Sequence, residues 1–422
     1  MTGSALKKQA FVVGAGLAGL SAATILAARG VAVTLIEAAG QAGGRCRSYV
    51  DAAMGQVIDN GNHLVMSGNR AVNDYVARIG TAKLLVGPTR AEGHFVDLRD
   101  GTRWKLKPSE SPVPFWIMQP NRRVPGTQAS DYWQYASLLW AKKDVRIGAA
   151  VKDRGPLWQR LMHPFLLAAL NTQPEEASAA LAGSVLRETF AKGGYYYRPR
   201  IAHPTLAAAF VDPALAFLKN ENASVQLGTR LRGLTFNNRR VIALETTDEV
   251  VPVAPEDMVV LAVPPWSAAD LIPGLTVPND FRAIVNAHFK LPAPKGTPAM
   301  LGVIGGTAEW IFAFSDRISV TVSAADAIVD LDREDLAIRI WADVTKALSI
   351  NSPLPAWQIV KEKRATFAAT PAQDARRPAA KTPWRNLVLA GDWIQTGLPA
   401  TIEGALRSGE TAAALALKHL SL

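Results

Sequence analysis

Three glycines near the start of the chain constrain its fold more than any other feature. Gly14, Gly16 and Gly19 follow one short apolar run, and Glu37 ends the next. This spacing predicts a strand, a tight turn, a helix and a second strand, with backbone that can approach a pyrophosphate at the helix N-terminus. A carboxylate after the second strand can accept hydrogen bonds from ribose hydroxyls, whereas it would repel a 2′-phosphate. We therefore expect a dinucleotide site that disfavours NADP. Its first residues are Gly14, Gly16, Leu17, Ala18, Gly19 and Glu37.

Two plainer interpretations of the same segment remain open. Residues 9–28 carry no charge and follow Lys7 and Lys8, a pattern that is also typical of a signal peptide or a transmembrane helix. A glycine turn that serves only packing is the other alternative. The spaced glycines and the strand ending in Glu37 argue against a membrane span.

A second glycine-bearing segment follows the acid. Gly43 and Gly44 allow close backbone approach, and the guanidinium of Arg45 suits phosphate. The polar run 59–63 then predicts a turn.

The C-terminal region carries a third segment of this kind. Residues 386–390 predict a strand that ends in Gly391 and Asp392, and a helical pattern begins near Ala405. An acid at the end of a strand, followed by the start of a helix, fits another corner of a site for anions and hydroxyls.

These segments together resemble the flavin-dependent amine oxidase and carotenoid desaturase superfamily. The resemblance implies an α/β fold: a Rossmann-like FAD-binding domain of the glutathione-reductase type with an interleaved α+β substrate domain. The discontinuous FAD-binding domain is expected at 1–84, 200–265 and 381–422. The substrate-binding domain is expected at 85–199 and 266–380.

The resemblance also implies roles for single residues. Glu37 would hold the adenosine ribose, Leu231 would lie near the adenine, and Arg45 with the first glycine turn would face the pyrophosphate. Asp392 would lie beside the ribityl-pyrophosphate arm, and Thr401 and Ile402 near the isoalloxazine ring. The other expected cofactor-binding residues are Gly43, Gly44, Asn62, His63 and Gly391.

A narrower resemblance comes from the middle of the chain. Residues 59–64, 164–172, 177–179, 185–187 and 210–215 resemble the squalene-associated branch of hydroxysqualene dehydroxylases of bacterial hopanoid synthesis, and residues 193–198 depart from it. This implies reductive dehydroxylation of hydroxysqualene to squalene, a polyprenyl lipid substrate and an unidentified electron donor. A phytoene-type carotenoid desaturase, an amine oxidase of the same superfamily, and a non-catalytic flavin-binding component of a lipid-synthesis complex remain alternatives, because the motifs bind cofactor and not substrate.

Removing an allylic hydroxyl requires a proton donor. Asp59, His63 and Glu403 are the candidates, and each has a plainer alternative: a turn, a core histidine and a helix cap, respectively. If residues 195–197 form a strand, one or two of their tyrosines could wall a cavity or stabilise a cation.

Composition narrows the cofactor chemistry. Cys46 is the only cysteine among 422 residues, so the chain can form neither an internal disulfide nor a cysteine-based metal cluster. No metal-binding motif is present, and no metal is expected. The C-terminal third offers no cysteine for a thioether to flavin, so FAD should be bound non-covalently unless a histidine forms the link.

Charge and aromatic residues bear on partners. The formal net charge is +10 and the isoelectric point is about 9.7. The sequence contains no nucleic-acid-binding motif, so we do not expect a nucleic acid as partner. Apolar and aromatic residues lie beside basic ones between 115 and 158, which is typical of a segment that contacts a lipid headgroup layer. We expect a cytoplasmic protein with peripheral membrane contact, while packing in a core remains the alternative for the same tryptophans. The residues concerned are 115–118, Arg122, Arg123, Trp133, Trp140, Lys142, Lys143 and Trp158.

Periodicity predicts further elements. Apolar alternation and short apolar runs predict strands at 223–227, 233–236, 240–245, 258–265, 299–303, 309–314 and 318–322. Helical spacing predicts helices at 157–170, 177–190 and 332–348.

Overall fold

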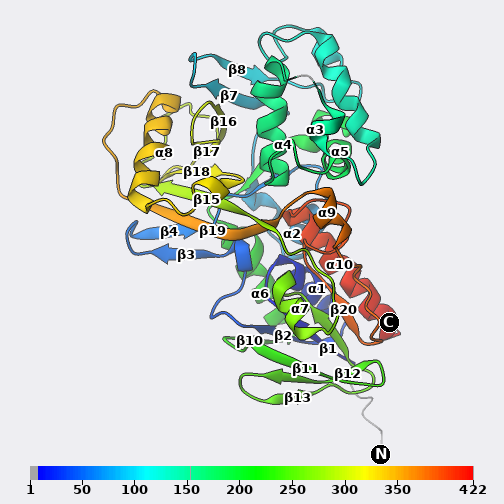
Figure 1. Ribbon diagram of the computed structural model, residues 1–422. Helices are drawn as coiled ribbons and strands as arrows, with labels where there is room; N and C mark the ends of the chain where they lie inside the picture. The colour runs from blue at the N-terminus through cyan, green and yellow to red at the C-terminus, as the bar shows by residue number, and fades with distance from the viewer. Residues whose placement is uncertain (1–7, 153, 422) are drawn as a thin grey trace, which may run out of the picture.

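A five-stranded parallel sheet collects strands from widely separated parts of the chain (Figure 1). The computed structural model describes residues 8–152 and 154–421; residues 1–7, 153 and 422 of the expected domain segments, Lys7 among them, lie outside the described residues. The strand order is β10 (Ser224–Leu227), β2 (Ala32–Glu37), β1 (Gln9–Val13), β14 (Met258–Leu261) and β20 (Leu387–Leu389). The fold is therefore α/β, as expected from the sequence.

Both faces of this sheet are covered, which explains why its central strands are apolar throughout. One face packs on α1 (Leu17–Ala28), α2 (Arg70–Arg78), α6 (Asp212–Asn220) and α10 (Ile402–His419). The other face packs on α7 (Pro265–Leu271) and a three-stranded sheet of β11 (Leu231–Asn237), β12 (Arg240–Thr246) and β13 (Val250–Pro252).

The uncharged segment 9–28 forms β1, the glycine turn and α1. In the described part of the chain, no helix has both the length and the apolar character needed to cross a bilayer. The segment belongs to the sheet domain, and its interpretation as a transmembrane helix is wrong.

A seven-stranded sheet forms the second layer of the molecule (Figure 1). Its neighbours pair antiparallel except β16 and β7, which run parallel. The order is β19 (Trp357–Phe367), β15 (Phe281–Phe289), β18 (Ile318–Val322), β17 (Trp310–Ala313), β16 (Met300–Ile304), β7 (Gly93–Asp97) and β8 (Arg103–Leu106).

Alternation along β15 explains why this sheet has two different faces. Ala283, Val285, Ala287 and Phe289 pack under helix α8 (Arg333–Leu348), which covers one face. Asn286 and the other intervening residues face the opposite side, because successive side chains of a strand alternate. That side meets the helical lobe, which consists of α3 (Ile147–Ala150), α4 (His163–Leu170) and α5 (Ala179–Glu188).

Smaller elements connect these layers. Two small sheets are formed by segments that link strands of the large sheets along the chain. One is the hairpin of β3 (Ser48–Asp51) and β4 (Gln56–Asp59). The other consists of β5 (Leu64–Met66), β9 (Pro199–Ala202) and β6 (Leu85–Val86). A short helix, α9 (Pro371–Ala375), precedes β20.

The tyrosine run is not a strand. Gly194–Tyr197 is a 3₁₀ helix, preceded by Gly193 at φ +91°, which turns the chain before the run begins. Tyr195 and Tyr196 are exposed and only Tyr197 is buried, so alternate tyrosines do not line two faces as the strand interpretation required. The strands predicted at 223–227, 233–236, 240–245, 258–265, 299–303, 309–314 and 318–322 are present, with β14 ending at Leu261 rather than at the proline pair.

Candidate cofactor site

The first glycine turn is held closed by the acid that follows β2. Glu37 accepts hydrogen bonds from the amides of Ala15 (2.7 Å) and Ala39 (2.8 Å). At Gly19 a Cβ atom would lie 1.8 Å from the carbonyl oxygen of Gly14, so the third glycine is required for α1 to pack against the turn. At Gly16, in contrast, an added Cβ would meet no atom within 4 Å, so this side of the turn is open to a ligand.

The second glycine turn lies directly against the first. The amide of Gly43 donates to the carbonyl of Ala15 (2.8 Å), and Gly43 and Gly44 have φ angles of +106° and +54°, which glycine adopts without strain. A Cβ at Gly44 would lie 3.4 Å from the Cα of Gly16. The two turns thus form one surface of bare backbone, which is the kind of surface that a pyrophosphate requires.

Arg45 connects this surface to the C-terminal region. Its guanidinium donates to the carboxylate of Asp392 (2.7 Å) and to the carbonyl of Ala365 (2.5 Å). The Arg45 side chain keeps 42% of its surface exposed, whereas that of Asp392 keeps 8%. Part of the guanidinium therefore remains accessible to an anion beside the glycine turns.

Asp392 is fixed by contacts that the sequence did not predict. The buried guanidinium of Arg377 donates to the carbonyls of Asp392 (3.2 Å) and Ile394. The amide of Gly391 donates to the hydroxyl of Ser408 on α10 (2.8 Å). These bonds hold the turn after β20 against α10. Neither Arg377 nor Ser408 stands in a motif, so only their contacts identify them.

Thr401 and Ile402 form the start of α10 beside this turn. The Thr401 hydroxyl accepts from the amide of Gly404 (3.0 Å) and caps the helix. The first amides of an α-helix have no partner within the helix, so this end can receive a polar group of a ligand. Ile402 is buried, with 8% of its surface exposed.

Asn62 and His63 approach the same corner from another loop. The side-chain amide of Asn62 donates to the hydroxyl of Thr321 (3.1 Å), and the backbone N–H of Asn62 donates to the side-chain oxygen of Asn286 (3.3 Å). Its side-chain oxygen is buried and has no partner within the described part of the chain, which leaves an acceptor available to a ligand. Burial, helped by the nearby cation of Arg45, lowers the pKa of His63 to about 4, so its imidazole is neutral at physiological pH.

Asp59 and Glu403 have structural partners. Asp59 accepts from the hydroxyl of Ser48 (2.6 Å) and the amide of Leu206 (2.9 Å), and burial raises its pKa. Glu403 accepts from the first-turn amides of α2 at 3.1 Å and 3.0 Å and from Arg407 (2.6 Å). Glu403 thus caps α2 rather than its own helix.

Leu231 lies on the strand that starts beside Glu37. The amides of Gly228 and Thr229 donate to the carbonyls of Ala39 (2.9 Å) and Glu37 (3.0 Å), so the start of β11 follows the end of β2. The half-buried Leu231 is therefore near the expected ribose end of the site.

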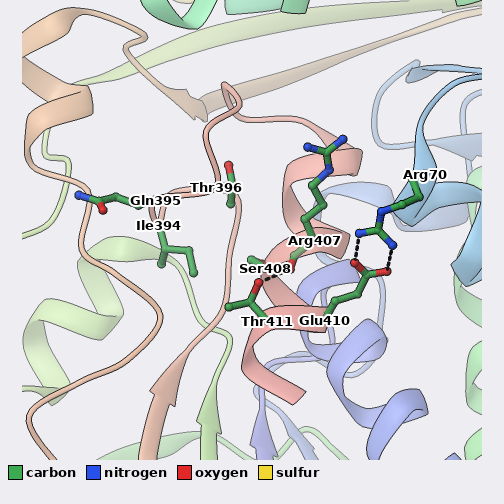
Figure 2. A pocket seen from close by; sticks show the side chains of 8 residues that line it. All are labelled: Arg70, Ile394, Gln395, Thr396, Arg407, Ser408, Glu410 and Thr411. Carbon is green, nitrogen blue, oxygen red and sulfur yellow. Dashed lines mark hydrogen bonds and ion pairs between the residues drawn. The ribbon is translucent and has the colours of Figure 1, made fainter. Parts of the chain in front are cut away.

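A small polar depression lies next to the Asp392 corner (Figure 2). It is lined by the loop Ile394–Thr396 and by side chains of α10 and α2. Arg70 pairs with Glu410 (2.5 Å) at its edge, and Arg407 pairs with Glu188 and Glu403 nearby. Since carboxylates already neutralise both arginines, this depression suits neither a phosphate nor a long apolar ligand.

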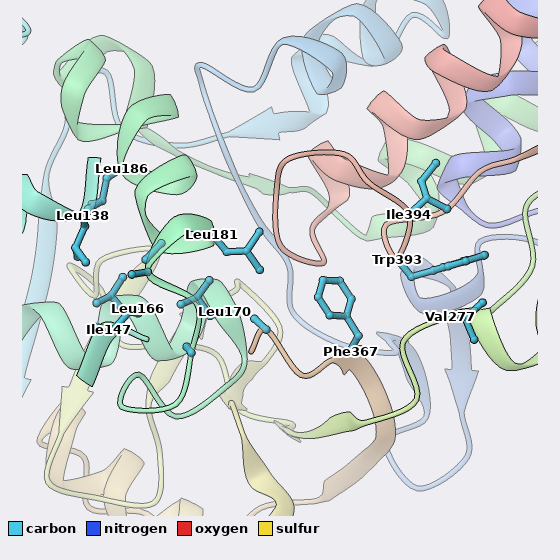
Figure 3. Packing of buried hydrophobic residues seen from close by; sticks show 14 of the residues in the cluster. Leu138, Ile147, Leu166, Leu170, Leu181, Leu186, Val277, Phe367, Trp393 and Ile394 are labelled. Atoms are coloured by element: carbon cyan, nitrogen blue, oxygen red, sulfur yellow. The ribbon is translucent and has the colours of Figure 1, made fainter. Parts of the chain in front are cut away.

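An apolar cluster adjoins the site on the other side. Leu170 and Leu181 of the helical lobe belong to the same buried cluster as Phe367, Trp393 and Ile394. Figure 3 shows Phe367 between the lobe leucines and the pair that follows Asp392. Apolar side chains thus extend from the helical lobe to the cofactor corner.

The sequence missed the polar residues of the seven-stranded sheet that support this corner. Asn286 and Thr321 hold Asn62 and bond to each other (2.8 Å). The alternation of polar and apolar residues in β15 and β18 was the signal that could have placed them on one face.

Comparisons with known proteins agree with this geometry. Residues 17–417 match the family described as flavin containing amine oxidoreductase. The chain is 54% identical over 413 residues to the hydroxysqualene dehydroxylase of Rhodopseudomonas palustris, covering 98% of this chain and 99% of that protein. It is 48% identical to the hydroxysqualene dehydroxylase of Sinorhizobium fredii, again covering 98% and 99%.

Solved structures show the same fold at low identity. Cyclohexylamine oxidase from Brevibacterium oxydans has a TM-score of 0.72 at 14% identity, covering 99% of this chain and 100% of that chain. Putrescine oxidase bound to putrescine has a TM-score of 0.68 at 18% identity, covering 97% and 98%. The open backbone at Gly16 and Gly44, the accessible cation of Arg45 and the free oxygen of Asn62 fit FAD.

Proposed function

Since the chain belongs to the flavin-containing amine oxidoreductase family and, within it, to the branch of the hydroxysqualene dehydroxylases, we propose that it converts hydroxysqualene to squalene by reductive dehydroxylation. It is an FAD-dependent oxidoreductase. The observation that carries the proposal is sequence identity of 46–54% to three hydroxysqualene dehydroxylases over nearly the whole of each chain. We further propose that the squalene formed is the precursor for hopanoid synthesis.

The residues of the site have separate tasks in this reaction. The bare backbone at Gly16 and Gly44 receives the pyrophosphate, Arg45 balances its charge, and Glu37 orients the loop that meets the ribose. Asn62 offers its free oxygen to the far end of the cofactor. Reduced FAD, when bound, supplies the hydride equivalent that replaces the hydroxyl group.

The apolar cluster suits a polyprenyl substrate. Burying hydrocarbon stabilises a complex by roughly 25 cal/mol per Å² removed from water. Phe367, Trp393 and Ile394 bring apolar side chains next to Asp392, so a hydrocarbon chain held by the lobe would lie beside the cofactor. The same side chains exclude water from the reacting carbon.

Turnover of hydroxysqualene tests the proposal. Purified protein is incubated with FAD, a chemical reductant without oxygen, and hydroxysqualene, and the lipids are analysed by mass spectrometry. We expect squalene, and we expect none when FAD is omitted. Unchanged alcohol in the complete mixture would exclude this reaction, and a non-catalytic flavin-binding role would then account for the protein.

Two other substrates serve as controls. Bleaching of bound flavin by an added amine would favour an amine oxidase, and conversion of phytoene would favour a desaturase. We expect neither flavin bleaching by amines nor conversion of phytoene, because the chain is 54% identical to a hydroxysqualene dehydroxylase over 98% of its length.

We also propose that two 3₁₀ segments, Phe115–Met118 and Ala129–Trp140, contact the membrane surface in which the substrate dissolves; the second segment packs on α5 of the helical lobe. Four large apolar side chains are exposed on these segments: Phe115 (66%), Met118 (67%), Trp133 (68%) and Trp140 (77%). Trp116 and Tyr132, whose rings meet at 5.4 Å, hold the two segments together.

Basic residues flank this exposed surface, as an anionic bilayer requires. Arg122 and Arg123 follow the first segment, and Lys142 and Lys143 follow the second. Trp158, which the sequence grouped with these residues, is buried with 4% exposed and packs in the core.

Vesicle sedimentation tests this contact. We expect the protein to bind phosphatidylglycerol vesicles more than phosphatidylcholine vesicles, and the double variant Trp133→Glu/Trp140→Glu to lose most of that binding. Ile338→Glu is the control, because Ile338 is 51% exposed on α8, outside the two segments. Equal binding by the double variant and the wild type would contradict the proposal.

A further inference from the structure

Trp310, the first residue of β17, has an indole nitrogen that none of the contacts above uses. Its Nε1 atom is buried and has no hydrogen-bond partner within residues 8–152 and 154–421. Buried polar atoms are nearly always hydrogen-bonded, and an indole nitrogen can only donate. The unpaired N–H therefore indicates that a bound molecule supplies an acceptor at this position.

Trp310 lies on the face of the seven-stranded sheet that meets the cofactor side. It is directly opposite Thr321 in the β17–β18 pair, and Thr321 is directly opposite Asn286 in the β18–β15 pair, so the three side chains share one face. The neighbouring residues Ile311 and Val320 pack with α8 on the other face. Trp310 packs against the apolar cluster that extends from the helical lobe to the cofactor corner.

Hydrogen bonds on this face determine how Asn62 is oriented. The hydroxyl of Thr321 donates to the side-chain oxygen of Asn286 (2.8 Å), so its own oxygen accepts from the side-chain amide of Asn62 (3.1 Å). This turns the unpaired oxygen of Asn62 away from the sheet. Directly opposite residues of paired strands have Cα atoms about 5 Å apart, so Trp310 starts next to the residue that holds Asn62.

The loop that carries Asn62 is fixed to the second glycine turn. The amide of Asn60 donates to the carbonyl of Arg47 (3.0 Å), and Arg47 ends the short 3₁₀ helix that contains Arg45. A continuous set of contacts therefore leads from the cation of the cofactor site through this loop to Thr321. Trp310 is the next residue across the sheet.

The ring of Trp310 has a defined position. A Cβ at Gly302, directly opposite on β16, would lie 3.2 Å from the Cζ3 atom of the indole, so the missing side chain makes room for the ring. Phe95 meets the ring edge to face, with the two centroids 5.9 Å apart. Cζ3 and Nε1 are at opposite edges of an indole, so the nitrogen lies on the side of the ring away from Gly302.

A second unpaired indole nitrogen lies farther from the cofactor corner. Nε1 of Trp104 is also buried without a partner in the described part of the chain. Its strand β8 is three strands beyond β17, and neighbouring strands are about 4.8 Å apart, so Trp104 starts roughly 14 Å from Trp310. It offers the same chemistry, but too far away for a group that is bound beside Asn62.

Resting on the proposed function, we propose that Trp310 recognises the hydroxyl group of hydroxysqualene by donating a hydrogen bond from Nε1 to its oxygen. The rest of this substrate is hydrocarbon, so the hydroxyl oxygen is the one acceptor that it offers. That oxygen is bonded to the carbon that must meet the cofactor. Its donor is therefore expected beside Asn62, where Trp310 lies.

The same contact separates substrate from product. Squalene has no oxygen, so the N–H of Trp310 stays buried without an acceptor when squalene occupies the site. The lost hydrogen bond and the unpaired donor together favour binding of the alcohol by about tenfold. Squalene therefore binds more weakly and is exchanged for new substrate.

The experiment measures which lipid the protein selects in the absence of turnover. Wild type, Trp310→Phe and Trp104→Phe, each loaded with oxidised FAD and given no reductant, are incubated with equal amounts of hydroxysqualene and squalene in detergent micelles. The protein is separated by gel filtration, and the bound lipids are quantified by mass spectrometry. The ratio of bound alcohol to bound hydrocarbon should be about tenfold lower in Trp310→Phe than in the wild type.

Trp104→Phe is the matched control. It makes the same change on the same face, its phenyl ring can still stack on Phe95, and it should keep the wild-type ratio. A smaller folded fraction lowers the amounts of both bound lipids and leaves their ratio unchanged, so partial unfolding of a variant does not imitate the expected result. A wild-type ratio in Trp310→Phe, or a loss of selectivity in Trp104→Phe alone, would overturn the inference.

A second measurement needs no variant that folds. Ultraviolet resonance Raman spectra contain an indole band that shifts when the N–H group donates a hydrogen bond. The spectrum of the wild type with hydroxysqualene, minus that with squalene, should contain this shift. An indole band that is the same with both lipids would contradict the role of Trp310.

These outcomes separate the inference from the proposed function. If the wild type with reduced FAD forms no squalene, the proposed function fails, and the role of Trp310 in it fails as well. If the wild type forms squalene and Trp310→Phe keeps the wild-type ratio of bound lipids, only the role of Trp310 fails.

Discussion

Arg45 and Asp392 are 347 residues apart in sequence, yet the guanidinium of one donates to the carboxylate of the other across 2.7 Å. The pair joins the second glycine turn to the turn after β20, and so closes the cofactor site from its two ends. The partly exposed guanidinium leaves room for a pyrophosphate, while the buried carboxylate keeps the cation in place.

Replacing Arg45 by methionine should therefore weaken FAD binding by about tenfold to a hundredfold, because a charge-assisted hydrogen bond contributes about 1.5–3 kcal/mol. Titration of the apoprotein with FAD, followed by flavin fluorescence, measures the change. Arg29→Met, at the exposed end of α1, should bind FAD as the wild type does. Equal affinity of Arg45→Met and the wild type would show that the cation does not face the phosphates.

The glycines of the first turn should respond differently to alanine. Gly16→Ala adds a Cβ to open space at an ordinary φ of −72°, so the free energy of unfolding should change by less than about 0.5 kcal/mol while FAD affinity falls at least about tenfold. Gly19→Ala drives its Cβ into the Gly14 carbonyl, so stability should fall by at least about 2 kcal/mol.

Thermal unfolding of the apoproteins and FAD titration separate the two effects. A Gly16→Ala variant that bound FAD normally would mean that the ligand does not approach this backbone.

Glu309, in the turn between β16 and β17, should make the stability of the protein depend on pH. Burial on folding raises the pKa of the Glu309 carboxyl group from 4.5 to about 7, so the stabilising contribution of the protonated group is complete below about pH 4.5 and is lost as the pH rises through 7. The free energy of unfolding of the wild type, minus that of Glu309→Gln, should therefore fall by up to about 3 kcal/mol across this range. Urea unfolding at several pH values checks this, and a difference that does not vary with pH would contradict it.

Cys46 should be unreactive in the folded protein. It is 5% exposed, and burial raises its pKa to about 12, so almost no thiolate is present near neutral pH. Mass spectrometry after treatment with iodoacetamide should detect no adduct on the native protein and one adduct after denaturation. Rapid labelling of the native protein would show that the second glycine turn opens in solution.

Local sequence patterns predicted the parts of the site that depend on local geometry. The spacing of Gly14, Gly16 and Gly19 requires a turn between strand and helix, and Asp392 follows an apolar run that became β20. Those features need no knowledge of distant residues, because a turn and a strand end are determined within a few positions.

Features that depend on burial could not be predicted in the same way. Trp133 and Trp140 are exposed whereas Trp116 and Trp158 are buried, although all four stand in similar apolar and basic surroundings in the sequence. Arg377 holds Asp392 through a contact between residues that meet only in the folded chain, so local spacing could not identify it.

Strand β15 of the second sheet was missed for a related reason. β15 alternates small apolar residues with Asn286 and other polar ones, because one face meets α8 and the other meets the cofactor side. The sequence of β15 therefore contains no continuous apolar run, and its pattern did not indicate a strand.

The last strand and last helix of the chain, β20 and α10, complete a sheet whose first strand is β1, and α10 packs against α1. β1 and α1 are synthesised before β20 and α10. The flavin therefore cannot be enclosed until β20 and α10 have also left the ribosome, and a polypeptide shortened before β20 should emerge colourless.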